Sequence, residues 1–334
     1  MDDVRAIHET PWGAEHSFVC CFCSKVGALR RRTASVPGTE AHRAHRRACR
    51  PASLLYPPFM RLACRTLAAL IGLLGCAKPT SHETAPPARA VILEELTWNE
   101  AERRLTPESV VVIPLGAASK EHGPHLSLKN DWLLAEHFKR QVLAADVIIA
   151  PTVGFSYYPA FSEYPGSISL RLETARDLVI DICKSLAAHG PRRFYVLNTG
   201  VSTVRALVPA AEMLAQEGIL LRHTDLGKAL GPTEKEIGRQ EGGSHADEIE
   251  TSMMLAIAPE TVDMKKAVKD YDASGQGGLT RRKGGTGTYS PTGIYGDPTL
   301  ATRAKGEKLV AALTRAILDD IEALRRSPLP TTPR

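Results

Sequence analysis

The sequence predicts an α/β fold, a three-layer α/β/α domain with a mainly parallel central sheet. Two observations predict it. From about residue 90 onwards, short apolar runs rich in β-branched residues alternate with longer amphipathic stretches. The short runs are bounded by residues that favour turns, as buried strands are. Because right-handed crossovers bring the carboxyl ends of parallel strands to one edge, we expect the loops after these strands to share a site.

Each element follows from its local pattern. Val110-Val-Val-Ile113 is short, β-branched and closed by Pro114, so it predicts a strand. By the same criteria, strands are predicted at residues 110–113, 147–150, 194–197 and 220–223. Helices are predicted at residues 131–145, 173–189, 203–217, 247–257 and about 299–325. The glycine-rich residues 274–290 are predicted to form a mobile lid or an irregular loop.

The last two helices differ in what their patterns indicate. Residues 299–325 carry apolar side chains at helical spacing and are predicted to be structural. These side chains are Leu309, Val310, Leu313, Ile317 and Ile321. Residues 247–257 instead open on an acidic cluster. We expect Asp247 to cap this helix, Glu248 to face solvent and Glu250 to face a site from the first turn.

The polar segment after the first strand is the strongest functional signal. Glu121, His122, His125 and Asp131 fall within eleven residues, and Gly123-Pro124 forces a loop between them. Carboxylates and imidazoles beyond the carboxyl end of a strand are what a hydrolytic metal site needs. Asp131 either caps the following helix or points into the site.

This segment resembles the signature of the creatininase-type amidohydrolases, in which a strand leads into Glu, His-Gly-Pro-His-Leu and Asp. Further blocks follow in the family's order and together span residues 92–325. They are Gly154-Phe-Ser156, Tyr164-Pro-Gly-Ser-Ile-Ser169, His245-Ala-Asp-Glu-Ile-Glu-Thr-Ser252 and Gly296-Asp-Pro-Thr-Leu-Ala-Thr302 with Lys305-Gly306. The resemblance implies the creatininase-like fold, hydrolysis of C–N bonds and a homo-oligomer.

The resemblance also implies two divalent metal ions. It assigns His122 and Asp131 to the metal site, with Glu250 as a further ligand and His245 as the residue that shuttles a proton. One departure is that Lys120 stands where the family has Glu. We therefore expect a bulge to bring Glu121 into the ligand position, because a metal ion repels an ammonium group.

A second departure is that Leu197-Asn-Thr-Gly-Val-Ser-Thr203 replaces the family's Asn-Gly-His-Gly-Gly-Asn block and its ligand His. The cofactor is thus expected to be one or two divalent ions per protomer, of Zn, Mn or Fe. Either a single metal remains, or water or another side chain fills the gap.

These residues predict a metal-dependent amidohydrolase that cleaves a non-peptide amide or cyclic amide bond of a small molecule. His125, Tyr157 and Ser202 are expected to contact the substrate, although His125 is also suited to holding the loop. Tyr158 and Tyr164 are further candidates for the pocket wall. The alternative is a non-catalytic exported lipoprotein that uses the same fold to bind a small molecule.

The N-terminal region is expected to be a leader. Residues 60–76 combine Arg61 and Arg65 with a short apolar run and end on Leu73-Leu-Gly-Cys76, like a lipoprotein signal peptide. Cys76 would be lipidated, Met60 would be the true start, residues 1–59 an upstream extension and residues 77–91 a flexible tether. The mature protein would then be periplasmic or membrane-anchored. The alternatives are a cytoplasmic enzyme that starts elsewhere, and a zinc site at Cys20-Cys-Phe-Cys23 with His42 and His45.

Charge argues against a nucleic-acid partner. The chain has a formal net charge of +5, but residues 1–76 carry 11 basic and 5 acidic residues, so the body is close to neutral. It lacks the basic stripe that nucleic-acid binding needs. Beyond Cys76 the sequence contains only Cys183, so the body cannot form an internal disulfide. Residues 326–334 are expected to be a disordered tail.

Overall fold

The computed structural model describes residues 90–331. The predicted signal peptide, Cys76, the upstream extension and the alternative zinc site all lie outside these residues. A five-stranded parallel sheet forms the middle of the described part, with strand order β1-β3-β2-β4-β5. Its strands are β1 (Val91–Ile92), β2 (Val110–Leu115), β3 (Ile148–Ile149), β4 (Arg193–Asn198) and β5 (Leu220–His223). Val91 thus belongs to the sheet rather than to the expected tether.

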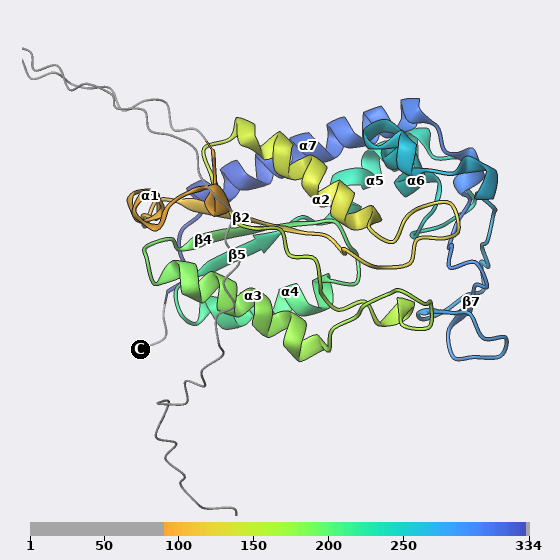
Figure 1. The fold of residues 1–334 in the computed structure, drawn as a ribbon, viewed down its shortest axis with the longest axis horizontal. Helices are drawn as coiled ribbons and strands as arrows, with labels where there is room; N and C mark the ends of the chain where they lie inside the picture. The colour runs from red at the N-terminus through yellow and green to blue at the C-terminus, as the bar shows by residue number, and fades with distance from the viewer. Residues whose placement is uncertain (1–89, 332–334) are drawn as a thin grey trace, which may run out of the picture. The chain divides into compact units, whose positions relative to one another are not determined.

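Helices cover both faces of the sheet (Figure 1). They are α1 (Trp98–Arg104), α2 (Asn130–Gln141), α3 (Leu172–Ala187), α4 (Val204–Ala215), α5 (Leu226–Ile237), α6 (Glu248–Ile257) and α7 (Arg303–Arg326). The alternation of side chains along β2 divides the core. Val110 and Val112 pack with α2, α5, α6 and α7, whereas Val111, Ile113 and Leu115 pack with α3 and α4. The predicted three-layer α/β/α fold is therefore confirmed.

Most elements lie where the sequence predicts them, but α1 and α5 have no counterpart among the predicted helices. Helix α5 contains Gly231-Pro232, a pair that is typical of a turn, and the helix continues through it. The short 3-10 helices are Leu93–Glu95, Val142–Ala144, Pro159–Phe161, Pro259–Thr261, Met264–Lys266 and Pro298–Leu300. The final helix extends to Arg326, one residue into the expected tail.

The glycine-rich segment has a short regular core. Its strands β6 (Leu279–Thr280) and β7 (Thr288–Tyr289) pair in parallel. The Glu163 carboxylate accepts hydrogen bonds from the Thr280 hydroxyl at 2.9 Å and from the Arg281 amide at 3.1 Å. These bonds attach the segment to the loop that precedes α3.

The direction of the crossovers marks one edge of the sheet as a place for a site. The chain leaves β2 towards β3 on one side, and leaves β4 towards β5 on the other. Where two neighbouring parallel strands are followed by connections in opposite directions, a crevice opens beyond their carboxyl ends. The loops after β2 and β4 flank this crevice.

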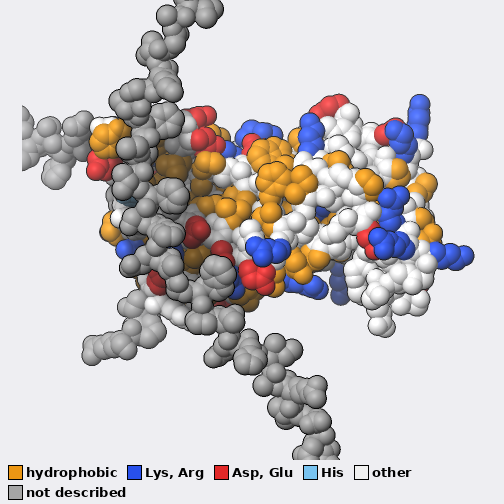
Figure 2. Space-filling model, turned by 60° about the horizontal axis from the view of Figure 1, so that its bottom comes forward, with side chains coloured by type: hydrophobic (Ala, Val, Ile, Leu, Met, Phe, Trp, Pro, Cys, Tyr) orange, Lys and Arg blue, Asp and Glu red, His pale blue; other side chains and the backbone are white. Residues whose placement is uncertain are grey.

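The surface mixes charged and apolar side chains. Figure 2 shows orange patches between blue and red groups on the side of α3 and α4. Val208 and Met213 of α4 are among the exposed large hydrophobic side chains.

Homo-oligomer formation stays a prediction. Within residues 90–331, no helix has both the length and the apolar character needed to cross a bilayer.

The crossing of α6 and α7 depends on a glycine. A Cβ atom on Gly306 would overlap the Ser252 carbonyl oxygen, so the two helices can approach this closely only where α7 has no side chain. Met253 and Met254 of α6 and Leu309 of α7 then meet in the same buried cluster.

We predict that Gly306→Ala lowers the free energy of unfolding by about 1–3 kcal/mol, because the added methyl forces the helices apart. Gly227→Ala is the matched control. It also lies within a helix, α5, and a Cβ atom there would meet only Asp225 Oδ1, at the ordinary contact distance of 3.5 Å. The control should be neutral or stabilising by up to about 1 kcal/mol. Urea unfolding followed by circular dichroism measures both, and equal effects would contradict the packing argument.

Candidate metal centre

The first turn of α2 is held against the end of β2. A Cβ atom on Gly116 would overlap the Asp131 carbonyl oxygen, so only glycine allows this approach. The Thr199 hydroxyl, from the loop after β4, donates to the Leu115 and Asp131 carbonyl oxygens, each at 3.1 Å. The loops on both sides of the crevice therefore fix the backbone of Asp131.

The Asp131 carboxylate points into the site rather than capping α2. Its Oδ1 lies 2.7 Å from His122 Nε2, and its Oδ2 lies 2.7 Å from Lys120 Nζ. All three side chains are buried. Burial alone would raise the pKa of Asp131, but the adjoining Lys120 ammonium and His122 ring lower it below the usual value.

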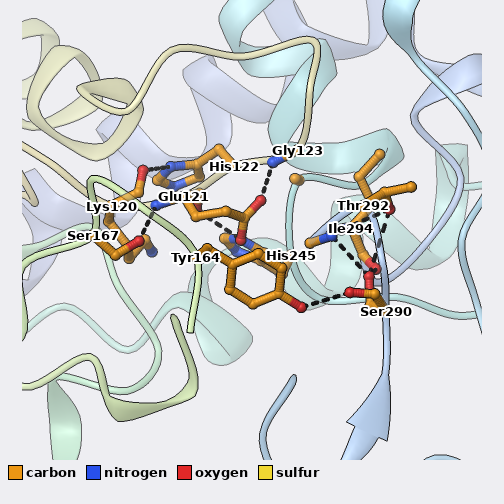
Figure 3. Close-up of polar contacts among 12 residues, drawn as sticks. Lys120, Glu121, His122, Gly123, Tyr164, Ser167, His245, Ser290, Thr292 and Ile294 are labelled. Carbon is orange, nitrogen blue, oxygen red and sulfur yellow. Dashed lines mark hydrogen bonds and ion pairs between the residues drawn. The ribbon is translucent and has the colours of Figure 1, made fainter. Parts of the chain in front are cut away.

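Main-chain carbonyls orient both imidazoles (Figure 3). His122 Nδ1 lies 2.8 Å from the Lys120 carbonyl oxygen, and His245 Nε2 lies 2.9 Å from the Glu121 carbonyl oxygen. Because a carbonyl only accepts, we assign a proton to each of these nitrogens. The other nitrogens face Glu250, with His122 Nε2 at 3.3 Å from Oε1 and His245 Nδ1 at 3.8 Å from Oε2.

The start of α6 places Glu250. Asp247 caps the helix as predicted, and its Oδ1 accepts from the Ile249 and Glu250 amides, each at 3.0 Å. The Ala246 amide donates to Glu250 Oε2 at 2.7 Å. Ala246 has a φ of 49°, a left-handed conformation that costs energy outside glycine. The chain therefore accepts local strain at the position that connects His245 to Glu250.

Asn130 is a site residue that the sequence reasoning misses. Its Nδ2 donates to Glu250 Oε1 at 2.9 Å and so connects the start of α2 with the start of α6. Its place next to Asp131 is the only signal in the sequence. Although burial raises the pKa of Glu250, the neighbouring His122 and His245 rings hold it well below the usual range.

Glu248 corrects an expectation. It does not face solvent: its side chain is fully buried and forms an ion pair with Lys305 of α7. Its Oε2 also accepts from the Arg239 amide at 2.8 Å and from the Gln240 amide at 2.6 Å. Glu248 therefore joins α6 to α7 and to the segment after α5.

The donor set fits a divalent metal ion. Ligand atoms of His122, His245 and Glu250 all lie within 4.8 Å of one another, and Asp131 Oδ1 adjoins His122. Imidazole nitrogen with carboxylate oxygen suits Zn²⁺, Mn²⁺ or Fe²⁺. Burial lowers the pKa of His122, but the Asp131 and Glu250 carboxylates outweigh burial and raise it to about 9. A positive charge is thus favoured at this position.

Glu121 lies next to His245 (Figure 3). Lys120 is the residue beside Asp131. The Glu121 carboxylate accepts from the Gly123 amide and lies 3.2 Å from His245 Nε2. A Cβ atom on Gly293 would overlap this carboxylate, so the glycine makes room for it. A ligand role for Glu121 stays a prediction.

The centre opens into a cavity of about 1030 Å³. Of the predicted site residues, Tyr157, Ser202, His245 and Glu250 line it. The cavity lining within the described residues does not include His125, whose Nε2 lies 2.8 Å from the Thr251 hydroxyl.

Two other tyrosines considered for the pocket wall are buried instead of lining the cavity. Tyr158 is fully buried, and the Tyr164 hydroxyl donates to the Ser290 carbonyl oxygen at 2.7 Å. Burial raises the pKa of Tyr164 to about 12, so this hydroxyl keeps its proton. Both residues thus support the loops around the cavity.

Known proteins resemble this chain in sequence and in fold. The creatininase family model, described as creatinine amidohydrolase, matches residues 94–321. A mycofactocin precursor peptide peptidase of Mycobacterium ulcerans (strain Agy99) is 29% identical over 237 residues, which are 67% of this chain and 89% of that protein. The creatinine amidohydrolase of Pseudomonas putida is 26% identical over 254 residues, covering 70% of this chain and 97% of that protein. The solved structure "Creatininase Mn" gives a TM-score of 0.61 at 25% identity, over 72% of this chain and 100% of that one.

We predict that His125 makes stability depend on acid pH. Burial lowers the pKa of His125 to about 4, below the value of about 6.5 expected in the unfolded chain. The unfolded state therefore binds a proton first, and stability is lost as pH falls from about 6.5 towards 4.

Replacement by Gln keeps a donor for Thr251 but does not titrate. His125→Gln should therefore lose roughly 1–2 kcal/mol less stability than the wild type between about pH 7 and about pH 4.5. Urea unfolding at several pH values measures this, with His189→Gln, an exposed histidine after α3, as the control. Identical pH profiles for wild type and His125→Gln would refute the assignment.

Proposed function

The chain belongs to the creatininase family, and from this premise we propose that it is a metal-dependent amidohydrolase that cleaves an amide or cyclic amide bond of a small molecule. Family membership supports hydrolase activity with a divalent metal ion. One observation carries the finer proposal. Donor atoms from the loop after β2, the start of α2 and the start of α6 converge beside a large cavity, which Glu250 and His245 line.

The roles follow from the geometry. His122, Asp131 and Glu250 would hold the ion, since their free nitrogen and oxygens face one another. When bound, a divalent ion supplies Lewis-acid chemistry, because it lowers the pKa of water from about 15.7 to about 7 and polarises a carbonyl oxygen. Asn130 and the Ala246 amide keep the two Glu250 oxygens in place.

His245 is the residue we assign to proton transfer. Its Nε2–H is engaged by the Glu121 carbonyl, so its Nδ1 is the atom that can accept a proton from water and return it to the departing nitrogen. The ring is held in place by Phe161, with ring centroids 4.3 Å apart, and it lines the cavity. This arrangement leaves the proton-carrying atom on the side of Glu250.

The substrate class is supported by the cavity rather than by any one contact. A volume of about 1030 Å³ is at the upper end for small-molecule pockets. Two aromatic residues, Tyr157 and Phe161, line the cavity together with Ser202. One relative is named as a peptidase of a precursor peptide and another as an amidohydrolase of creatinine. A panel that includes linear amides, cyclic amides and short peptides therefore tests the restriction to non-peptide bonds.

Export as a lipoprotein is part of the proposal and rests on the sequence alone. The basic, apolar and Leu-Leu-Gly-Cys portions of residues 60–76 support processing at Cys76. A lipid-anchored enzyme would meet its substrate outside the cytoplasm.

We predict that His122→Ala and Glu250→Gln abolish metal binding and slow hydrolysis at least ~100-fold, because each removes a donor. Metal content by inductively coupled plasma mass spectrometry and turnover of the panel are the measurements. His137→Ala, on α2 but outside the cluster, is the control and should leave both unchanged. Substrate binding without any metal in the wild type would support the binding module instead.

His245→Ala separates the two roles that this residue can have. Because we assign His245 to proton transfer, we expect the variant to keep its metal and to lose turnover, and the same two measurements show this. If the variant loses its metal as well, then His245 is a ligand, in line with its place in the three-residue cluster.

We predict that labelled palmitate enters the wild-type chain expressed in a bacterial host and is absent from Cys76→Ser. Cys183→Ser is the control, because Cys183 is buried in α3 and should not affect labelling. Equal labelling of wild type and Cys76→Ser, or none in either, would contradict the lipoprotein assignment.

A further inference from the structure

Lys120 places a buried ammonium inside the candidate metal centre. The residue is only 4% exposed, and Nζ lies 2.7 Å from Asp131 Oδ2. The ammonium also lies over two aromatic rings, 4.8 Å from the Phe161 centroid and 5.5 Å from the Tyr158 centroid. Within residues 90–331, Asp131 is its one carboxylate partner at salt-bridge distance. Burying a charged group without a partner is costly, and Asp131 supplies that partner.

The two oxygens of Asp131 face two different groups. Oδ1 faces His122 and, beyond it, Glu250, whereas Oδ2 faces Lys120. Oδ2 is buried and makes no hydrogen bond with a second group in the described part of the chain. The side of Asp131 that is opposite the His122–Glu250 cluster is therefore already filled by a positive group.

The surroundings of Lys120 are poor in metal donors. Thr199 uses its hydroxyl on two carbonyl oxygens, and Tyr158 and Phe161 present ring faces. The described residues contain one group of three or more suitable side chains within ligand distance, which is His122 with His245 and Glu250. With Lys120 in place, a second metal ion on this side would thus have no free imidazole or carboxylate donor, because the Lys120 ammonium already pairs with Asp131 Oδ2.

Charge balance also indicates that the centre holds one divalent ion. The centre buries or half-buries the carboxylates of Glu121, Asp131 and Glu250. One divalent ion and one ammonium neutralise three carboxylates. A second divalent ion in the presence of Lys120 would leave two uncompensated positive charges in a buried site, which is strongly unfavourable.

We propose that Lys120 is a resident cation of the centre, which occupies one side of Asp131 and limits the site to one divalent ion per protomer. This inference rests on the proposed function, because it concerns the same metal site. It also places a positive group in the wall of the cavity, which His245 and Glu250 line as well. A substrate oxygen in this cavity would meet an N–H donor of Lys120 as well as the ion.

The test is the metal content of the full chain. Protein is loaded with excess Mn²⁺ or Zn²⁺, desalted and analysed by inductively coupled plasma mass spectrometry. The wild type should hold one ion per protomer, and Lys120→Glu, which replaces the cation by a donor, should rise towards two. Lys120→Gln removes the charge with little change in size, frees Asp131 Oδ2 and adds an amide oxygen beside it, so its content should also exceed one.

Lys139→Gln is the matched control. Lys139 is also a buried lysine, paired with Glu94 at 2.6 Å, but it lies at the far end of α2 and does not line the cavity. Its replacement should leave one ion per protomer. Far-UV circular dichroism shows which variants are folded, and Lys120→Gln decides if Lys120→Glu does not fold.

The outcomes are distinct. Two ions in the wild type overturn the inference, and so does a content of one in both folded Lys120 variants, because Lys120 would then not be the limiting group. No ion in the wild type, under any loading condition, overturns the proposed metal-dependent function and this inference with it.

Discussion

The rest of the centre depends on the interactions that stabilise the buried Asp131 carboxylate. It is 1% exposed and is stabilised by His122 on one oxygen and Lys120 on the other. Removing a charge from water costs several kcal/mol unless close partners compensate for it. The fold meets this requirement by bringing α2 against the end of β2, which in turn needs Gly116 and the Thr199 hydroxyl. The sheet topology, Gly116 and the Lys120–Asp131 ion pair thus act together to hold the Asp131 carboxylate in the site.

The sequence was sufficient for the parts that depend on periodicity. Alternating apolar runs predict β2, β4 and β5 and the helices between them, because burial of one face imposes a pattern on the chain. Asp131, nine residues after His122 and at the start of a helix, was likewise predictable as a site residue. The structure then decides that its side chain points into the site and does not cap the helix.

The sequence could not predict the contacts that depend on the path of a single loop. Lys120 and Glu121 are neighbours, and only the path of the loop determines which side chain faces Asp131. The contact of Asn130 with Glu250 joins segments more than a hundred residues apart, and the contact of Ala246 with Glu250 depends on an unusual φ angle at Ala246. Neither contact produces a periodic pattern in the sequence. Helix α5 was not predicted for a different reason: the helix continues through Gly231-Pro232, because tertiary packing outweighs the low helix propensity of this pair.

The hydrogen bond between Asn130 and Glu250 spans 120 residues of sequence, and it joins the two halves of the centre. Contacts of such long range are costly to form, because a long loop must close before they contribute. An unfolded chain would therefore offer an ion only scattered donors, whereas the native state offers them together. Ligands that bind the native state selectively shift the folding equilibrium in its favour. Metal availability during synthesis would thus act as a determinant of how much folded protein accumulates, independently of any effect on turnover.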